Sequence, residues 1–245
     1  MIVLGLDTAT AATVAGLRLK SGNVLERRDD PPAGSHPGHA TRLLAMIAEL
    51  LEEGGVSWQE IERIAVGLGP GTFTGLRVGV ATARGLAHSR GIELVGVSSL
   101  RALAYGALEG SGGEELPERP ELALAVIDAR RGEVFAAAYE RGTAEVPREL
   151  SAPAALAPER VVELVTRAGT PAAGSRLLVG DGAVRYRELL KAAGLRVAAA
   201  DSPLHLVSAE ALCALGGGAD AGSGAAGVLP EYVRRPDAEL ALEGA

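Results

Sequence analysis

One short pattern occurs twice in this chain: a run of apolar residues that ends in an aspartate. The first run covers residues 2–6 and ends at Asp7, and the second covers residues 122–127 and ends at Asp128. A turn follows each aspartate, and a second apolar run follows each turn, at residues 14–19 and 134–139. Continuous apolar runs of this length are typical of buried strands. The chain is therefore predicted to contain two similar units that each begin with two antiparallel strands.

Strands and helices alternate after the opening of each unit. Apolar residues at helical spacing predict helices over residues 39–53 and from 73 to about 89, on either side of a strand at 64–68. The second unit is predicted to have helices near residues 158–167 and 184–193 and strands at 177–179 and 195–199. A duplicated mixed sheet with helices predicts a two-lobed α/β protein. This is the layout of the actin-like (ASKHA) fold of sugar kinases and Hsp70 proteins.

The boundary between the predicted lobes follows from composition. Residues 109–121, EGSGGEELPERPE, are rich in glycine, proline and acidic residues and have little to bury, so we expect them to be a linker. The first lobe would then cover residues 1–108 and the second residues 122–202. A last segment from about 203 to 245, with a helix at 208–215, is expected to return to the first lobe.

Composition excludes several classes of function. The chain has 24 Lys and Arg against 31 Asp and Glu, a net charge of -7, and only 3% aromatic residues. A broad nucleic-acid-binding surface is therefore not expected. A single cysteine, Cys213, can form neither an internal disulfide nor a zinc-binding pair. No apolar run approaches the about 20 residues that span a bilayer, and the N-terminus lacks a basic region, so we expect a cytoplasmic protein.

Turns that follow an aspartate in this way bind phosphates in actin-like ATPases. The first turn here is Asp7-Thr8-Ala9-Thr10, which lacks a glycine that would let a phosphate approach the backbone. The second turn contains Asp128, Arg130 and Arg131 in place of small residues. We interpret both as degenerate, structural turns. The alternative is that each aspartate still holds a hydrated metal ion for a working ATPase site.

The Gly-rich run at residues 67–79 is the densest feature of the sequence. It is not a P-loop, because Leu76 and Arg77 follow Gly75 where Lys and Ser or Thr would be required. In the helix that follows, small residues recur every four positions at Gly75, Gly79, Ala83 and Ala87. Glycine inside a helix costs about 1 kcal/mol relative to alanine, so another backbone is expected to pack closely here. The sequence leaves open whether that backbone belongs to this chain or to a partner.

The remaining candidates for catalysis or metal binding are weak. His36 and His39 lie three residues apart, but Pro37 and Gly38 between them prevent a helical pair of metal ligands. No Gly-x-Ser-x-Gly or His-Glu-x-x-His motif occurs. We therefore expect no catalytic centre and no metal site in this chain.

Four segments resemble the bacterial TsaB family. They are residues 2–10 (IVLGLDTAT), 69–79 (GPGTFTGLRVG), 127–135 (IDARRGEVF) and 230–235 (PEYVRR), in the same order and across nearly the whole chain. TsaB proteins are non-catalytic actin-like relatives of TsaD that serve tRNA threonylcarbamoyladenosine biosynthesis. The Gly-Pro-Gly-x-Phe-Thr-Gly-Leu-Arg segment is the most specific of the four.

The resemblance implies partners and a surface. TsaD transfers a threonylcarbamoyl group to N6 of adenosine 37 of tRNAs that read codons beginning with A, and TsaE is an ATPase that joins the assembly. A TsaB-like chain would pair with a TsaD-like subunit or form a homodimer, would meet tRNA only through the complex, and would contact ATP only at a subunit boundary. The pairing surface would be the two first-lobe helices, with the residues His39, Leu43, Ile47, Phe73, Gly75, Leu76, Gly79, Val80 and Ala83. The alternative function is an autonomous actin-like ATPase or small-molecule kinase.

Overall fold

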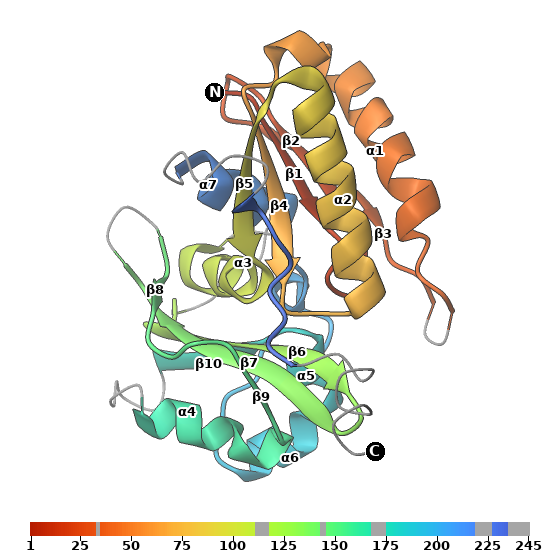
Figure 1. The fold of residues 1–245 in the computed structure, drawn as a ribbon. Helices are drawn as coiled ribbons and strands as arrows, with labels where there is room; N and C mark the ends of the chain where they lie inside the picture. Colours follow the sequence, from red (N-terminus) through yellow and green to blue (C-terminus); the bar gives the residue numbers. More distant parts are fainter. Residues whose placement is uncertain (33–34, 111–117, 143–145, 168–174, 219–226, 235–245) are drawn as a thin grey trace, which may run out of the picture.

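The computed structural model describes residues 1–32, 35–110, 118–142, 146–167, 175–218 and 227–234. Its centre is a pair of mixed β-sheets, one in each of two lobes, with helices packed around them (Figure 1). The two-lobed α/β architecture that the repeated pattern predicts is therefore confirmed.

The first sheet has the strand order β3-β2-β1-β4-β5. β1 pairs antiparallel with β2 and parallel with β4, as the sequence predicts for the opening of the unit. The strands are β1 (Val3–Asp7), β2 (Thr13–Arg18), β3 (Val24–Asp29), β4 (Arg63–Gly69) and β5 (Glu93–Ser98). All residues of β1 are buried, because helices cover both faces of the sheet.

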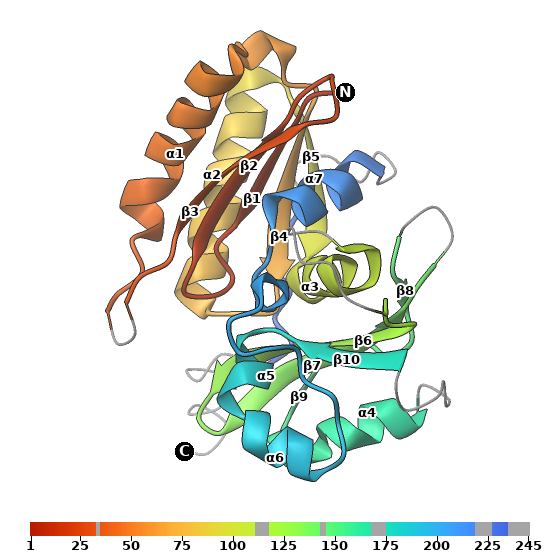
Figure 2. The ribbon, with the colours of Figure 1, turned by 180° about the vertical axis from the view of Figure 1, so that it is seen from behind.

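Two long helices lie side by side on one face of this sheet, α1 (His39–Gly54) and α2 (Phe73–Arg90), and α7 (Ala209–Gly218) covers the other face (Figures 1 and 2). Both long helices end at a glycine in the left-handed region, Gly55 and Gly91, with φ of 59° and 67°. A 3-10 turn, Trp58–Glu60, precedes β4. No helix among the described residues is long and apolar enough to cross a membrane.

The second sheet has the order β10-β6-β7-β8, and β9 also pairs with β7. Its strands are β6 (Leu122–Arg130), β7 (Glu133–Glu140), β8 (Arg148–Glu149), β9 (Ala154–Leu156) and β10 (Arg176–Val179). Its helices are α4 (Val161–Arg167), α5 (Asp181–Arg185) and α6 (Arg187–Ala192), with 3-10 turns at Pro158–Arg160 and Pro203–His205. Alternate residues of β6 enter two different apolar clusters, which explains why its run of apolar residues is unbroken.

The helix α3 (Ser99–Tyr105), continued by a π-helical turn at Gly106–Gly110, lies between the two sheets (Figure 1). It packs on β4 and β5 of the first sheet and on β6 and β7 of the second. One apolar cluster therefore contains residues of both lobes, including Leu100, Leu103, Ile127 and Phe135.

Several elements differ from the sequence prediction. The strand expected at residues 195–199 is reduced to one bridge between Leu178 and Val197. The helix expected at 184–193 is two helices, because Tyr186 between them leaves helical geometry with φ -104° and ψ 23°. The edge strands β3, β8 and β9 were not expected. Much of the predicted linker, residues 111–117, lies outside the described residues.

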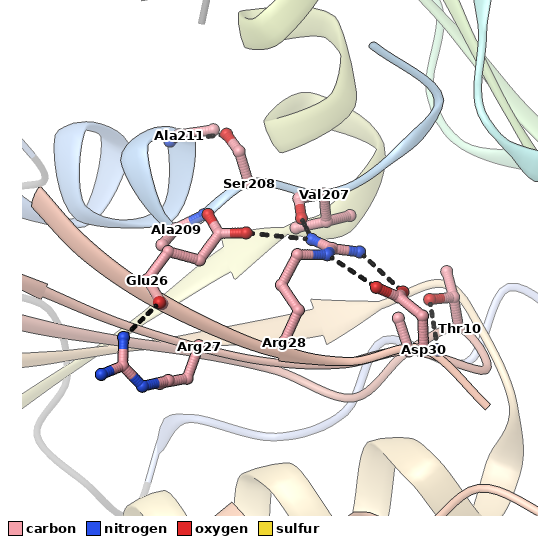
Figure 3. A network of polar contacts seen from close by, with 10 residues as sticks. Thr10, Glu26, Arg27, Arg28, Asp30, Val207, Ser208, Ala209 and Ala211 are labelled. Atoms are coloured by element: carbon pink, nitrogen blue, oxygen red, sulfur yellow. Dashed lines mark hydrogen bonds and ion pairs between the residues drawn. The ribbon is translucent and has the colours of Figure 1, made fainter. Parts of the chain in front are cut away.

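The C-terminal part of the chain is attached to the first sheet by charged side chains of β3 (Figure 3). Glu26 accepts a hydrogen bond of 2.7 Å from the backbone amide of Ala209, in the first turn of α7. Arg28 donates one of 2.6 Å to the carbonyl oxygen of Val207 and also pairs with Asp30. The carboxylate satisfies an amide that the start of a helix leaves free, which fixes where α7 begins.

Candidate functional site

Asp7 lies at the end of β1 with only 1% of its surface exposed. Its carboxylate accepts hydrogen bonds of 2.6 Å from the Ser99 hydroxyl and 2.8 Å from the amide of Ala9. Burial raises the pKa of this carboxyl, and the bonds from Ser99 and Ala9 offset part of that rise. A Cβ on Gly67 would overlap the same carboxylate. Asp7 is thus enclosed by its own lobe, in a setting that suits a structural role.

The turn after Asp7 packs directly against the Gly-rich loop. The Thr8 hydroxyl donates a hydrogen bond of 2.7 Å to the carbonyl oxygen of Gly75, and the amide of Thr72 donates one of 2.8 Å to the carbonyl of Ala9. A Cβ on Gly71 would overlap the Ala9 carbonyl. The glycines therefore let two segments of this chain meet.

The same contact shows which backbone packs against the small residues of α2. A Cβ on Gly75 would overlap the Thr8 carbonyl oxygen, and a Cβ on Gly79 would overlap the Thr8 hydroxyl. Ala83 and Ala87 are buried against the sheet. The close backbone that the glycines require is the Asp7–Thr10 turn of this chain, where Thr10 accepts a hydrogen bond of 3.3 Å from the amide of Ala12.

Eight of the nine residues predicted to form the pairing surface are buried in the first lobe. They are His39, Leu43, Ile47, Gly75, Leu76, Gly79, Val80 and Ala83. They lie on the sides of α1 and α2 that face the sheet, and this corrects the expectation that they form a contact surface themselves. Phe73 is the exception, with 40% of its surface exposed.

His39 begins α1 and is 5% exposed. Its Nδ1 lies 2.8 Å from the Thr13 hydroxyl. Burial lowers the pKa of this imidazole, although the Thr10 backbone and Asp29 act in the opposite direction. His39 therefore connects the start of α1 to β2 as a neutral ring.

In the second turn, the carboxylate of Asp128 forms ion pairs with two arginines. Oδ2 of Asp128 lies 2.9 Å from a guanidinium nitrogen of Arg185 and 3.6 Å from one of Arg130. Oδ1 accepts a hydrogen bond of 3.0 Å from the Arg130 amide. The strand continues past Asp128 to Arg130, so the connection to β7 is a tight hairpin rather than an open loop. Arg130, Arg131 and Gly132 all have positive φ, at 62°, 53° and 81°.

The arrangement of these groups offers little chemistry. Both aspartates are occupied by partners within the chain. No group of three His, Cys, Asp or Glu residues suited to a metal ion occurs among the described residues. Cys213 is fully buried, and burial raises the pKa of its thiol to about 12, so it is not a nucleophile.

The outer sides of α1 and α2 form a surface that the sequence analysis missed. Eight of its exposed residues are small or apolar: Ala40, Thr41, Leu44, Ala45 and Ala48 of α1 and Thr74, Ala81 and Gly85 of α2. We call these eight residues the outer helix face. Exposed Glu49, Glu52, Arg77 and His88 of the same helices lie among or beside them. Leu44 is 55% exposed, and a Cβ on Gly85 would meet nothing within 4 Å. The available signal was the recurrence of small residues away from the core positions, such as Ala45 and Ala48 of α1 and Ala81 and Gly85 of α2.

Known proteins match this chain over both lobes. The sequence profile of the family described as "TsaD: tRNA N6-adenosine threonylcarbamoyltransferase" matches residues 31–239. The tRNA threonylcarbamoyladenosine biosynthesis protein TsaB of Escherichia coli strain K12 is 34% identical over 195 residues, 80% of this chain and 78% of that protein. An uncharacterised Pseudomonas aeruginosa protein with similarity to the peptidase YeaZ has a crystal structure that matches with a TM-score of 0.75 and 33% identity. That match covers 95% of this chain and 99% of the other.

A more distant structure is similar in fold alone. Component A of (R)-2-hydroxyglutaryl-CoA dehydratase from Acidaminococcus fermentans matches with a TM-score of 0.51 and 10% identity, over 88% of this chain and 97% of that chain. These likenesses extend over both sheets, so the predicted actin-like fold is confirmed. The chain belongs to the TsaB family, whose members take part in tRNA threonylcarbamoyladenosine biosynthesis.

Proposed function

We propose that this chain is the non-catalytic, organising subunit of the complex that places threonylcarbamoyl on N6 of adenosine 37 of tRNAs that read ANN codons. It pairs with a TsaD-like catalytic paralogue, and a TsaE-like ATPase joins the pair. In the cytoplasm it meets tRNA through the complex, and ATP only where subunits meet.

The observation that carries this proposal is the contrast between the two turns and the outer helix face. The carboxylates of Asp7 and Asp128 are enclosed by contacts within the chain, at the place where an actin-like ATPase would bind phosphates. The residues of the outer helix face, in contrast, are small or apolar and exposed. No helix or strand of the described residues covers α1 and α2 on that side (Figure 1).

Gly85 adds a specific reason to expect a helix partner on this face. Glycine within a helix is less favourable than alanine by about 1 kcal/mol. Gly75 and Gly79 have a reason within the fold, because a side chain there would overlap Thr8. Gly85 has none, since the space around it is open. A helix of a TsaD-like subunit, or of a second copy of this chain, that packs closely against α2 would explain why position 85 is a glycine.

Reconstitution tests the function. The TsaD-like and TsaE-like subunits of the same organism, ATP, a threonylcarbamoyl donor and tRNA are assayed with and without this chain. We expect transfer to adenosine 37 to depend on its presence. Full transfer in its absence would contradict the proposal.

The alternative, an autonomous ATPase or kinase, is tested on the isolated chain. The proposal predicts no steady ATP turnover by the isolated chain. Micromolar affinity for ATP together with steady hydrolysis would favour the alternative instead.

A further inference from the structure

The C-terminal motif at residues 230–234 runs as an extended segment from the first lobe to the second (Figure 1). The motif is not part of the outer helix face. It makes specific contacts with both lobes. We refer to residues 228–234 as the strap.

The strap is seated on the first lobe by backbone and side-chain contacts. Val228 is buried in the apolar cluster of that lobe, and the amide of Glu231 donates a hydrogen bond of 2.8 Å to the carbonyl of Leu68 at the end of β4. The ring of Tyr232 lies 5.5 Å from that of Phe73, the first residue of α2. Arg77 donates a hydrogen bond of 3.1 Å to the Tyr232 hydroxyl.

The end of the strap lies on the second lobe. Arg234 donates a hydrogen bond of 3.0 Å to Glu133, the first residue of β7, and its guanidinium lies 6.0 Å above the ring of Phe135. Val233 packs against the apolar cluster that contains Phe135. In the pairing of β6 with β7, Glu133 lies opposite Arg130. The strap therefore ends at the hairpin that follows Asp128.

We infer that the strap is a clamp that holds the two lobes closed. The contacts described above for Asp7, Thr8 and Asp128 are each made within one lobe, so these contacts do not themselves join the lobes. The helix α3 joins the lobes through its packing on both sheets. The strap adds a second connection, from α2 to the β6–β7 hairpin.

The chemistry of the contacts indicates a clamp that can open. Glu133 and Arg234 have 40% and 29% of their side chains exposed, and Phe73 and Tyr232 are 40% and 42% exposed. Partly exposed ion pairs are individually weak and are screened by salt. Because Phe73 lies at the start of α2, a subunit on the outer helix face would lie close to the clamp. This last point rests on the proposed function, whereas the clamp itself does not.

The distance between the lobes in the isolated chain tests the clamp. Spin labels are placed at Ser89→Cys in α2 and Lys191→Cys in α6, both exposed. The buried Cys213 is not expected to react. Electron–electron double resonance then measures the distance distribution. We expect Arg234→Glu to broaden it and shift its maximum, and the exchange Glu133→Arg with Arg234→Glu to restore it.

Leu229→Ser is the matched control, because Leu229 belongs to the same strap but is 57% exposed. It should leave the distribution unchanged. Tyr232→Ala removes the first-lobe contact and should give the same shift as Arg234→Glu. Circular dichroism shows that each variant is folded. A distribution that is identical in the native chain, Arg234→Glu and Tyr232→Ala would overturn the inference, whatever the chain does in a complex.

Discussion

The hydroxyl of Thr8 donates a hydrogen bond of 2.7 Å to the carbonyl oxygen of Gly75, and thereby joins the turn after β1 to the first turn of α2. Both the turn and the Gly-rich loop are accounted for by this contact. The features that would bind phosphate in an ATPase serve here to pack one segment of the chain against another.

Gly79→Ala tests this packing. The added Cβ would overlap the Thr8 hydroxyl, so we expect a loss of about 1–3 kcal/mol in the free energy of unfolding, as for other overpacked sites. Gly85→Ala is the control in the same helix, where the space is open, and it should raise stability by about 1 kcal/mol. Urea denaturation measures both. Equal effects of the two substitutions would show that the Thr8 contact does not constrain Gly79.

Asp7→Asn tests whether the buried carboxylate is structural. Burial raises its pKa, so the ionised form is disfavoured in the folded state, and the uncharged amide can still bond to Ser99 and Ala9. We expect the free energy of unfolding at pH 7.5 to stay within about 1 kcal/mol of the native value or to rise. Threonylcarbamoyl transfer by the reconstituted complex should be unchanged. A folded Asp7→Asn variant that abolishes transfer would assign the carboxylate a direct role.

We expect the buried His39 to lower the free energy of unfolding in mild acid. Its pKa is lowered in the folded state, so below the unfolded value of about 6.5 the unfolded chain binds a proton that the folded chain does not. Stability should therefore fall as the pH decreases from 7 to 5, with a slope of at most about 1.4 kcal/mol per pH unit from this residue. His39→Gln cannot titrate, and should flatten that slope in urea titrations. Parallel slopes for the two proteins would exclude His39 as the source.

The sequence predicts the fold well where burial is complete. Residues 2–6 and 122–127 are continuous apolar runs because helices or a second cluster cover both faces of their strands. β3, with the sequence VLERRD, was missed because an edge strand can carry charges that pack against other elements, as Glu26 and Arg28 do against α7.

The outer helix face was harder to predict, for a reason that lies in α2 itself. Small residues occur on both of its sides, with Gly75 and Gly79 facing the core and Ala81 and Gly85 facing outward. Helical periodicity separates the two sets but does not say which one meets the sheet. The burial of Leu76 and Val80 and the position of Thr8 against Gly75 decide this, and the Thr8 contact joins residues 67 positions apart.

The affinity of the Gly85→Leu variant for the TsaD-like paralogue tests the central claim most directly. The isolated variant should fold normally, because the site is open, and calorimetric titration should show at least about a tenfold loss of affinity, equivalent to 1.4 kcal/mol. Lys191→Leu adds the same side chain to an exposed position of α6 and should bind as the native chain does. Native affinity in a folded Gly85→Leu variant would contradict the claim that this chain acts through the outer helix face.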